Sequence, residues 1–256
     1  MVKPNFICIG VQKSGTTSLI NYLSLHPEIY MKNVECHFFD REKGKHITNR
    51  DIIEYEKLFV TNKKIIGEKT PSYNYLPFAM DRIYMYNPNI KLILLLREPI
   101  SRAFSQYNMV LNFMGKTLND VNEEEILKGF EKEEHLKFSE LTCNGNYYIL
   151  RGFYDEIIEY IYSKFPKENL YIGISEEIKS DKWNEYNKII NFLGAKETDD
   201  IKKGHDTHVR IYNKEMPKCL SKKLYNIYKP HNERLYQLLG RKIDAWEEYY
   251  NTLDLM

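Results

Sequence analysis

The opening of the chain constrains its fold more than any other stretch. A nearly continuous apolar run, Asn5–Ile9, ends at Gly10, and such a run is typical of a buried parallel strand. Apolar residues then recur at helical spacing over Thr16–Leu25. His26-Pro27 ends this helix because the residue before a proline avoids the helical region. A strand, a glycine-containing turn and a helix, in this order, predict an α/β fold.

Short apolar runs alternate with helical patterns along the rest of the chain. Alternation of this kind favours a parallel sheet covered on both faces, so we predict a P-loop-like three-layer α/β fold. The length suits a single domain over residues 1–256. The further predicted strands are Lys64–Gly67, Lys91–Leu96 and Leu170–Ile174, and the further predicted helices are Phe78–Tyr86, Ile100–Asn112, Tyr154–Phe165, Trp183–Leu193 and Lys222–Leu239.

Charge and hydropathy give no reason to expect nucleic acid or a membrane as a partner. The 256 residues carry 37 basic and 36 acidic side chains, a net charge of +1. The densest apolar stretch, Leu92–Leu96, is too short to cross a bilayer, and the apolar N-terminal run is too short for a signal peptide. We therefore expect a soluble, cytoplasmic protein, and no oligomeric state follows. Its four cysteines are expected to be reduced thiols, with a Cys143–Cys219 bridge as the alternative.

The turn after the first strand has the composition of a phosphate-binding loop. Backbone N–H groups of such a turn and of the following helix converge on an anion, and the helix dipole favours negative charge there. Glycines allow close approach of the backbone, and Lys13 supplies a point charge. The residues predicted to bind the anion are Gly10, Gln12, Lys13, Ser14, Gly15, Thr16, Thr17 and Ser18.

This loop departs from the ATP-binding Walker A pattern. Gly10 and Gly15 have the Walker spacing, but Thr16 takes the place of the lysine, which stands at position 13 instead. Arg97 follows the strand Lys91–Leu96, where a P-loop NTPase has a metal-binding aspartate. The pattern favours transfer of an anionic group with no metal required. A P-loop kinase using ATP and Mg²⁺ is one alternative, and a non-enzymatic binding module is another.

Four segments of the chain resemble the sulfotransferases that use 3'-phosphoadenosine-5'-phosphosulfate (PAPS), in particular the heparan sulfate sulfotransferases and their bacterial relatives. The likeness is specific in the first half of the chain and looser in the second half. It implies a sulfotransferase that converts PAPS to 3'-phosphoadenosine-5'-phosphate (PAP). The four segments are GVQKSGTTSLINYLSLHP (Gly10–Pro27), ECHFFD (Glu35–Asp40), GEKTPSYNYLP (Gly67–Pro77) and KLILLLREPISRAFSQY (Lys91–Tyr107).

The resemblance implies roles on the donor side of the reaction. Lys13 would contact the oxygen between phosphate and sulfur, where a cation is bound most strongly as charge builds in the transition state. Arg97 and Ser105 would bind the 3'-phosphate of the donor. Arg102, one turn before Ser105, could add charge there or form a surface ion pair. In the weaker second half, the residues expected at the donor are Tyr154, Lys203, Gly204 and, in place of an arginine missing at position 205, Arg210.

The same resemblance implies roles on the acceptor side. Glu35 is the expected general base, and His37 is expected to assist as a second base or to position Glu35 or the acceptor. Lys69 would lie close to the transferred sulfuryl group. The expected acceptor is a hydroxyl or amine, first of all on a carbohydrate, with direct in-line transfer. The basic stretch Arg41–Arg50 suits a polyanionic glycan, whereas the acidic stretch Asn119–Glu140, expected to be a solvated helix or mobile excursion, does not.

Overall fold

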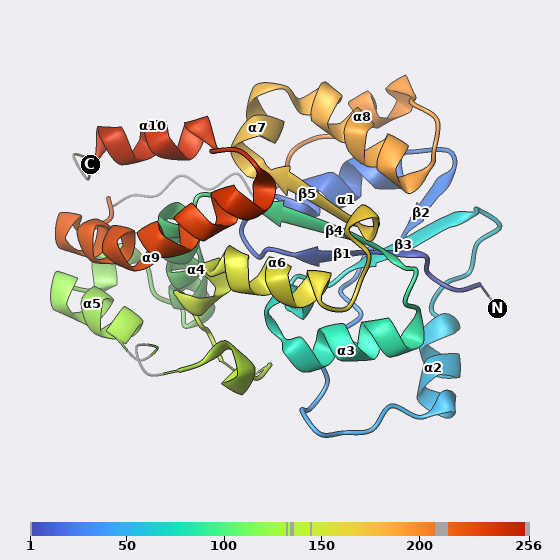
Figure 1. The fold of residues 1–256 in the computed structure, drawn as a ribbon, viewed down its shortest axis with the longest axis horizontal. Helices are drawn as coiled ribbons and strands as arrows, with labels where there is room; N and C mark the ends of the chain where they lie inside the picture. The colour runs from blue at the N-terminus through green and yellow to red at the C-terminus, as the bar shows by residue number, and fades with distance from the viewer. Residues whose placement is uncertain (1, 132, 134–135, 144, 208–214, 254–256) are drawn as a thin grey trace.

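A parallel β-sheet lies at the centre of the computed structural model, which describes residues 2–131, 133, 136–143, 145–207 and 215–253 (Figure 1). Within those residues the sheet has five strands in the order β2-β3-β1-β4-β5, and every neighbouring pair is parallel. β1 and the loop after it therefore occupy the middle of the sheet. The strands are β1 (Phe6–Gly10), β2 (Ile29–Met31), β3 (Ile65–Lys69), β4 (Lys91–Leu96) and β5 (Leu170–Ile174).

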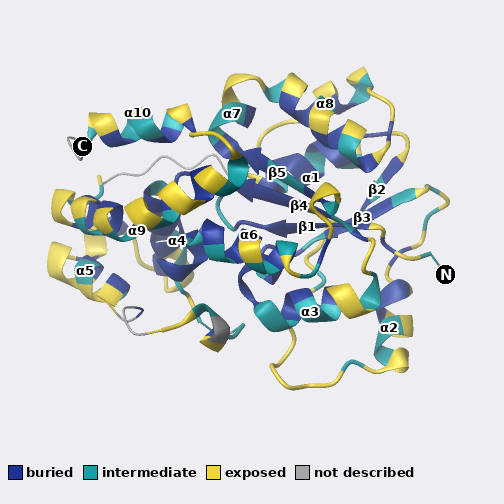
Figure 2. Cartoon of the chain, viewed as in Figure 1, coloured by how far each residue is buried: buried dark blue, intermediate teal, exposed yellow. Residues whose placement is uncertain are grey.

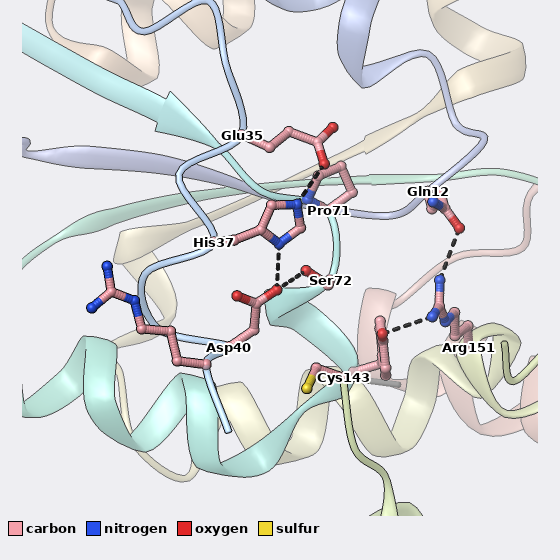
Figure 3. Close-up of a pocket in the computed structure, with 10 residues that line it drawn as sticks. Gln12, Glu35, His37, Asp40, Pro71, Ser72, Cys143 and Arg151 are labelled. Atoms are coloured by element: carbon pink, nitrogen blue, oxygen red, sulfur yellow. Dashed lines mark hydrogen bonds and ion pairs between the residues drawn. The ribbon is translucent and has the colours of Figure 1, made fainter. Parts of the chain in front are cut away.

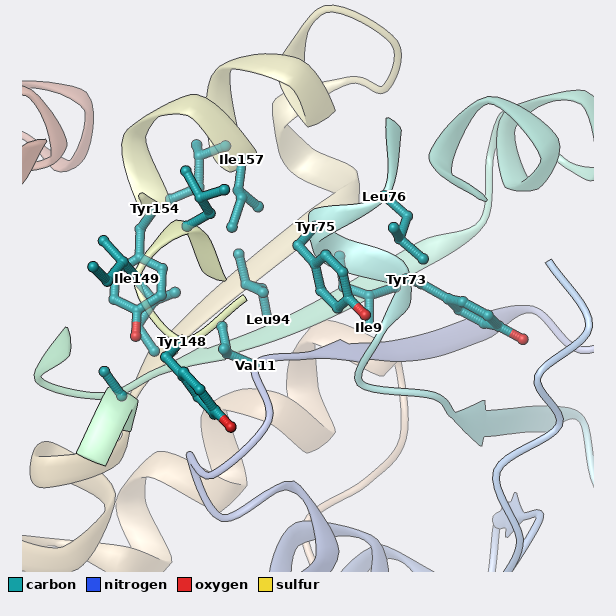
Figure 4. Packing of buried hydrophobic residues seen from close by; sticks show 14 of the residues in the cluster. Ile9, Val11, Tyr73, Tyr75, Leu76, Leu94, Tyr148, Ile149, Tyr154 and Ile157 are labelled. Carbon is teal, nitrogen blue, oxygen red and sulfur yellow. The ribbon is translucent and has the colours of Figure 1, made fainter. Parts of the chain in front are cut away.

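Side chains of the central strands alternate between two apolar cores, one on each face of the sheet. In β4, Leu92, Leu94 and Leu96 belong to the larger core, whereas Ile93 and Leu95 belong to the smaller one. Successive side chains of a strand point to opposite faces, so an unbroken apolar strand needs cover on both. Figure 4 shows part of the larger core, and Figure 2 shows the buried centre of the molecule.

Helices cover both faces, which confirms the predicted three-layer α/β architecture. α1 (Thr16–Ser24) and α8 (Lys182–Leu193) pack on the smaller core, and α7 (Ser175–Ser180) joins them. The larger core is covered by α2 (Asn49–Glu56), α3 (Pro77–Tyr86), α4 (Pro99–Phe113), α5 (Glu123–Glu131), α6 (Tyr154–Tyr162), α9 (Lys218–Leu239) and α10 (Asp244–Thr252). Short 3₁₀ turns are η1 (Tyr73–Tyr75), η2 (Leu118–Asp120), η3 (Phe138–Glu140), η4 (Leu150–Gly152), η5 (Lys167–Asn169) and η6 (Asp199–Lys203).

The predicted strands and helices are all present, and their ends differ by a few residues. The largest difference is at α9, which begins at Lys218 rather than Lys222. Sequence patterns missed β2, α2, α7 and α10. For α2 a signal was there: Thr48 and Asp51 form a reciprocal capping box, in which Thr48 N donates to the Asp51 carboxylate at 2.9 Å and Asp51 N donates to Thr48 Oγ1 at 3.3 Å.

The acidic stretch 119–140 is not simply a solvated helix, and that expectation is corrected. Ile126 and Phe130, four residues apart on α5, are fully buried in the larger core. Glu133 is also buried, and its carboxylate accepts the backbone N–H groups of residues 148–150, the last two at 2.8 and 3.0 Å. Burial raises the pKa of Glu133, although these bonds oppose the change. The described part of the stretch therefore packs on the larger core and, through Glu133, holds the backbone at the start of η4.

None of the four cysteines forms a disulfide in the structure, so the alternative Cys143–Cys219 bridge is not formed. The Cys219 sulfur lies 2.8 Å from Glu123 Oε1 on α5. Cys8 is fully buried in β1, where burial raises the pKa of its thiol to about 12. Among the described helices, none combines the length and apolar character needed to cross a membrane.

Candidate functional site

The loop between β1 and α1 is shaped to receive an anion. Three of its residues have positive φ angles: Gly10 (141°), Lys13 (77°) and Gly15 (89°). Such reversals of backbone hand turn consecutive N–H groups to the same side and make a concave anion site. The first turn of α1 adds N–H groups that have no partner within the helix. A side chain at Gly15 would meet no atom within 4 Å, so the space in front of the helix is open. The loop therefore fits a phosphate group.

Arg97 ties the end of β4 to this loop. Its NH1 donates to the Lys13 carbonyl oxygen at 3.0 Å, and its own carbonyl oxygen accepts from the Tyr154 hydroxyl at 2.8 Å. Ser175 Oγ, at the start of α7, donates to the carbonyl oxygen of Ser14 at 3.0 Å, which fixes the loop from that side. The side chain of Arg97 is half-buried, so it stays accessible beside the loop. A cation thus stands at the carboxyl end of a central strand, where ligands bind in open α/β sheets.

Three residues predicted to be catalytic meet beside the first turn of α1. Lys69 Nζ lies 2.7 Å from Glu35 Oε1 and 3.3 Å from Thr17 Oγ1. His37 Nε2 lies 3.3 Å from the other carboxylate oxygen of Glu35. The Glu35 side chain is 37% exposed, so a ligand can reach the carboxylate. The end of β3 and the segment that contains Glu35 therefore converge on the phosphate loop.

The charge state of this cluster follows from its contacts. A hydrogen bond to Asp40, with Nδ1 to Oδ2 at 2.8 Å, and a second one to Glu35 raise the pKa of His37 to about 10. Burial works to raise the pKa of Glu35, but the hydrogen bonds from His37 and Lys69 outweigh it and lower the pKa overall. At neutral pH the imidazole is therefore protonated and Glu35 is ionised. Ser72 Oγ also donates to Asp40 Oδ2 (Figure 3).

Residues 32–47, which include Glu35 and His37, belong to no helix or strand. Their backbone is instead held by side chains from the segment after β3. The N–H groups of residues 36 and 37 donate to Thr70 Oγ1 at 3.2 and 3.4 Å. Those of residues 38 and 39 donate to Tyr73 OH at 2.9 and 3.3 Å. Buried Glu68 accepts from both hydroxyls, at 2.7 Å from Thr70 and 3.1 Å from Tyr73. The two segments recognised separately in the sequence thus build one network.

A polar pocket of about 350 Å³ opens beside Glu35 and His37 (Figure 3). Arg151, only 6% exposed, forms one wall: NH1 donates to Gln12 Oε1 at 2.8 Å, and NH2 donates to Tyr75 OH at 2.7 Å. Gln12 belongs to the phosphate loop, so the pocket adjoins that loop. The lining residues are Gln12, Glu35, His37, Asp40, Arg41, Pro71, Ser72, Tyr75, Cys143 and Arg151.

The other residues predicted for the donor make different contacts in the structure. Ser105 on α4 is buried, and Tyr154 is buried with its hydroxyl on the Arg97 backbone. Lys203 is exposed and pairs with Asp200 at 2.6 Å. Gly204 packs against a tyrosine ring of α1, where a side chain would come within 2.6 Å of Tyr22 Cδ1. Arg210, also predicted to bind the donor, lies outside the described residues.

Sequence reasoning missed several residues of the pocket. Asp40 and Ser72 lie inside the recognised segments, and the spacing of Asp40 three residues after His37 was an available signal. Tyr75 also lies inside a recognised segment, Gly67–Pro77, but its spacing gave no signal, and none was available for Arg151. Of the two roles considered for Arg102, the surface ion pair is wrong: Arg102 is fully buried, donates to Gln106 Oε1 at 2.7 Å and to the Tyr148 carbonyl, and so holds the backbone before η4.

Gly10→Ala is expected to destabilise the protein by more than about 2 kcal/mol, because a side chain at this position has no room. An added Cβ would overlap Asn74 Nδ2 and lie 2.9 Å from the Pro71 carbonyl oxygen. Gly240→Ala is the matched control, since Gly240 also has a positive φ (68°) but no atom within 4 Å. It should cost only about 1 kcal/mol. Urea unfolding of both variants measures the difference, and equal losses would contradict the steric argument.

The interactions of protonated His37 are expected to stabilise the protein at low and neutral pH. Because the pKa of His37 is raised from 6.5 to about 10 on folding, this contribution is complete below about pH 6.5 and is lost as pH rises through about 10. The difference in unfolding free energy between wild type and His37→Asn should therefore shrink over that range. Urea unfolding at several pH values measures it, and a difference that does not change with pH would contradict the assignment.

Comparisons with known proteins agree with this geometry. Residues 3–236 match the family model described as the sulfotransferase domain. Human heparan sulfate glucosamine 3-O-sulfotransferase 5 is 28% identical over 266 residues, covering 94% of this chain and 73% of the relative. Human heparan sulfate glucosamine 3-O-sulfotransferase 6 is 27% identical, covering 93% and 72%. A sulfotransferase crystal structure from Alicyclobacillus acidocaldarius superposes with a TM-score of 0.75 at 27% identity, covering 96% of this chain and all of that one.

The matched region contains the phosphate loop, the Glu35–Lys69 cluster and Arg97, so the family match and the site coincide in the chain. The sequence also argues against the kinase alternative. A kinase would need the Walker lysine and a metal-binding aspartate, and both are absent from their expected positions. A loop for phosphate, a carboxylate beside it and an adjoining polar pocket are the parts that group transfer requires. The chain belongs to the sulfotransferase family.

Proposed function

We propose that this protein transfers the sulfuryl group of PAPS directly to a hydroxyl group of a carbohydrate. The observation that carries the proposal is the position of Lys69, whose ammonium lies 2.7 Å from Glu35 and 3.3 Å from the Thr17 hydroxyl of α1. One side chain thus reaches both the phosphate-loop helix and the carboxylate at the pocket. Donor and acceptor held on these two sides would meet across a few ångströms, as direct transfer requires.

On the donor side, the loop N–H groups and Lys13 bind the 5'-phosphosulfate. The bond between sulfur and the bridging oxygen breaks, and its electron pair goes to the phosphate, which leaves as part of PAP. Lys13 stabilises this growing negative charge more in the transition state than in the ground state. Arg97 and Ser105 bind the 3'-phosphate. Tyr154 acts through Arg97, because its hydroxyl donates to the Arg97 carbonyl oxygen. In this proposal, Lys203, Gly204 and Arg210 complete the donor site.

On the acceptor side, Glu35 takes the hydroxyl proton as the new oxygen–sulfur bond forms. We assign His37 a positioning role rather than that of a second base, because its hydrogen bonds to Asp40 and Glu35 raise its pKa to about 10 and so favour the protonated ring at neutral pH. It holds Glu35 in place, with Asp40 behind it. Lys69 balances the charge of the sulfuryl oxygens. This chemistry uses no covalent enzyme intermediate and no metal.

The pocket supports a carbohydrate as the acceptor. Its volume, about 350 Å³, lies in the range of small-ligand sites, and most of its lining residues carry polar or charged groups. Arg41 and Arg151 line it as cations, which suits an acceptor that carries acidic substituents. The curated relatives are named for sulfation of a glucosamine in heparan sulfate, and that supports the same class here.

Labelled PAPS offered with glycans, phenols and amines tests the proposal. We expect transfer to a glycan hydroxyl, undiminished by EDTA. Isothermal titration with PAP and with ADP–Mg²⁺ is the companion measurement, and PAP should bind more tightly. Tighter binding of ADP–Mg²⁺, or transfer only to phenols or amines, would contradict the proposal.

A further inference from the structure

Arg82 on α3 contacts the backbone of the segment that follows His37. Its NH1 donates to the carbonyl oxygens of residues 39 and 41, at 2.8 and 2.7 Å. Its NH2 donates to those of residues 42 and 45, at 3.0 and 2.6 Å. A single guanidinium on α3 therefore holds four carbonyl groups of a segment that itself forms no strand or helix. The two carbonyls on NH1 lie on either side of Asp40.

The charge of Arg82 serves the segment rather than a surface ion pair. In the part of the chain that the structure describes, no carboxylate lies within 4 Å of it, and its guanidinium stacks 5.0 Å from the Phe78 ring centroid. Burial lowers the pKa of Arg82, and the negative charge of Asp40 opposes this change. A guanidinium has five donors in fixed directions, more than the three rotatable donors of a lysine ammonium, so it can hold four carbonyl groups at once.

Asp40 depends on this backbone for its contact with His37. Its carboxylate is buried and receives His37 Nδ1 at 2.8 Å together with the Ser72 hydroxyl. The N–H groups of residues 38 and 39 are held from the other side by Tyr73 OH. The charged groups around the imidazole are Glu35 and Asp40, and Lys69 on β3 acts through Glu35. Arg82 is the part of this support that lies outside the recognised segments of the sequence.

We propose that Arg82 is a positioning residue: it fixes the backbone on both sides of Asp40, so that Asp40 holds His37 against Glu35. The catalytic consequence rests on the proposed function, in which Glu35 is the base. The structural consequence does not, because the titration of His37 reports directly on its contact with Asp40. A loosened segment lets Glu35 drift from the acceptor, and misplacement of about 1 Å can cost up to about 100-fold in rate.

The test compares Arg82→Gln and Arg82→Lys with Arg241→Gln, a control arginine whose guanidinium pairs with Glu177 on the surface. NMR titration of the His37 ring is the first readout. In both Arg82 variants its pKa should fall from about 10 towards 6.5, and in the control it should stay unchanged. The second readout is kinetic. We expect kcat to fall at least about 10-fold while the Kd for PAP, which also reports on folding, stays within about threefold.

Each outcome is decisive. An unchanged His37 titration in Arg82→Lys, with PAP binding intact, would overturn the proposal. If the Arg82 variants change the His37 titration but the wild-type protein sulfates nothing, the positioning role is supported and the proposed function is rejected. If Arg82→Gln loses PAP binding through misfolding, the milder Arg82→Lys variant carries the test. A fall in kcat with no change in the His37 titration would also count against the proposal, because the effect would then take another route.

Discussion

Glu35→Gln is expected to lower kcat for sulfuryl transfer by about 10²–10⁴-fold, the usual range for loss of a general base. The amide keeps the shape of the side chain but cannot take the proton of the acceptor. Binding of PAP should persist or tighten slightly, since Lys69, now 2.7 Å from Glu35, would lose its anionic partner and remain near Thr17. The defect should therefore appear in kcat and not in donor affinity.

Single-turnover transfer from labelled PAPS, together with calorimetric titration of PAP, measures both quantities for this variant. Glu233→Gln is the matched control, because Glu233 is an exposed carboxylate on α9. A Glu35→Gln rate within about 10-fold of wild type would place the base elsewhere. Loss of PAP binding in Glu35→Gln would instead show that the carboxylate maintains the donor site, which the geometry does not predict.

Lys13→Met is expected to slow transfer by about 10²–10³-fold, the effect typical of removing one preorganised donor from a developing oxyanion. The ammonium acts mainly as the bond between sulfur and the phosphate oxygen breaks, so PAPS affinity should fall much less than the rate. Methionine suits this test because it keeps the length of the side chain. It also carries the same Cβ at a φ of 77°, so the backbone cost of the loop is unchanged.

Rates at saturating PAPS and the Kd for PAP separate the two effects in Lys13→Met. Lys222→Met serves as the control, because Lys222 is exposed on α9. Equal losses in affinity and in kcat/KM, with kcat unchanged, would mean that Lys13 binds the ground state and the transition state equally. That result would remove Lys13 from the bond-breaking step.

Local patterns were enough to predict most of the fold. The run Lys91–Leu96 and the proline at the start of α4 are strong signals that need no distant contact. β2 has only three residues and lies at the edge of the sheet, so it carries no period that could be recognised. α10 also lacks a sequence pattern that predicts it, because a distant contact stabilises it. Its Trp246 is fully buried and donates from Nε1 to Glu176 at 3.0 Å.

The candidate site divides in the same way. Glu35, His37 and Lys69 could be predicted because each lies in a short segment whose composition points to chemistry. Arg151 and Arg82 could not. Arg151 contacts Gln12 across 139 positions of sequence, and Arg82 contacts carbonyl groups 37 to 43 positions away. An arginine in a helix or turn is usually a surface residue, and only its partners distinguish a structural one.

The sequence by itself determined the chemistry of the loop: the lysine at position 13 and the arginine at position 97 point to an anionic donor without the Walker arrangement. Tertiary structure alone decided the ionisation of the groups that face it. Asp40 and Glu35 keep His37 protonated, and Lys69 with His37 keeps Glu35 ionised. These effects depend on distances of about 3 Å between side chains and on their burial, because electrostatic energies fall with distance and with access of water. Such distances exist only after the strands have brought separate segments together.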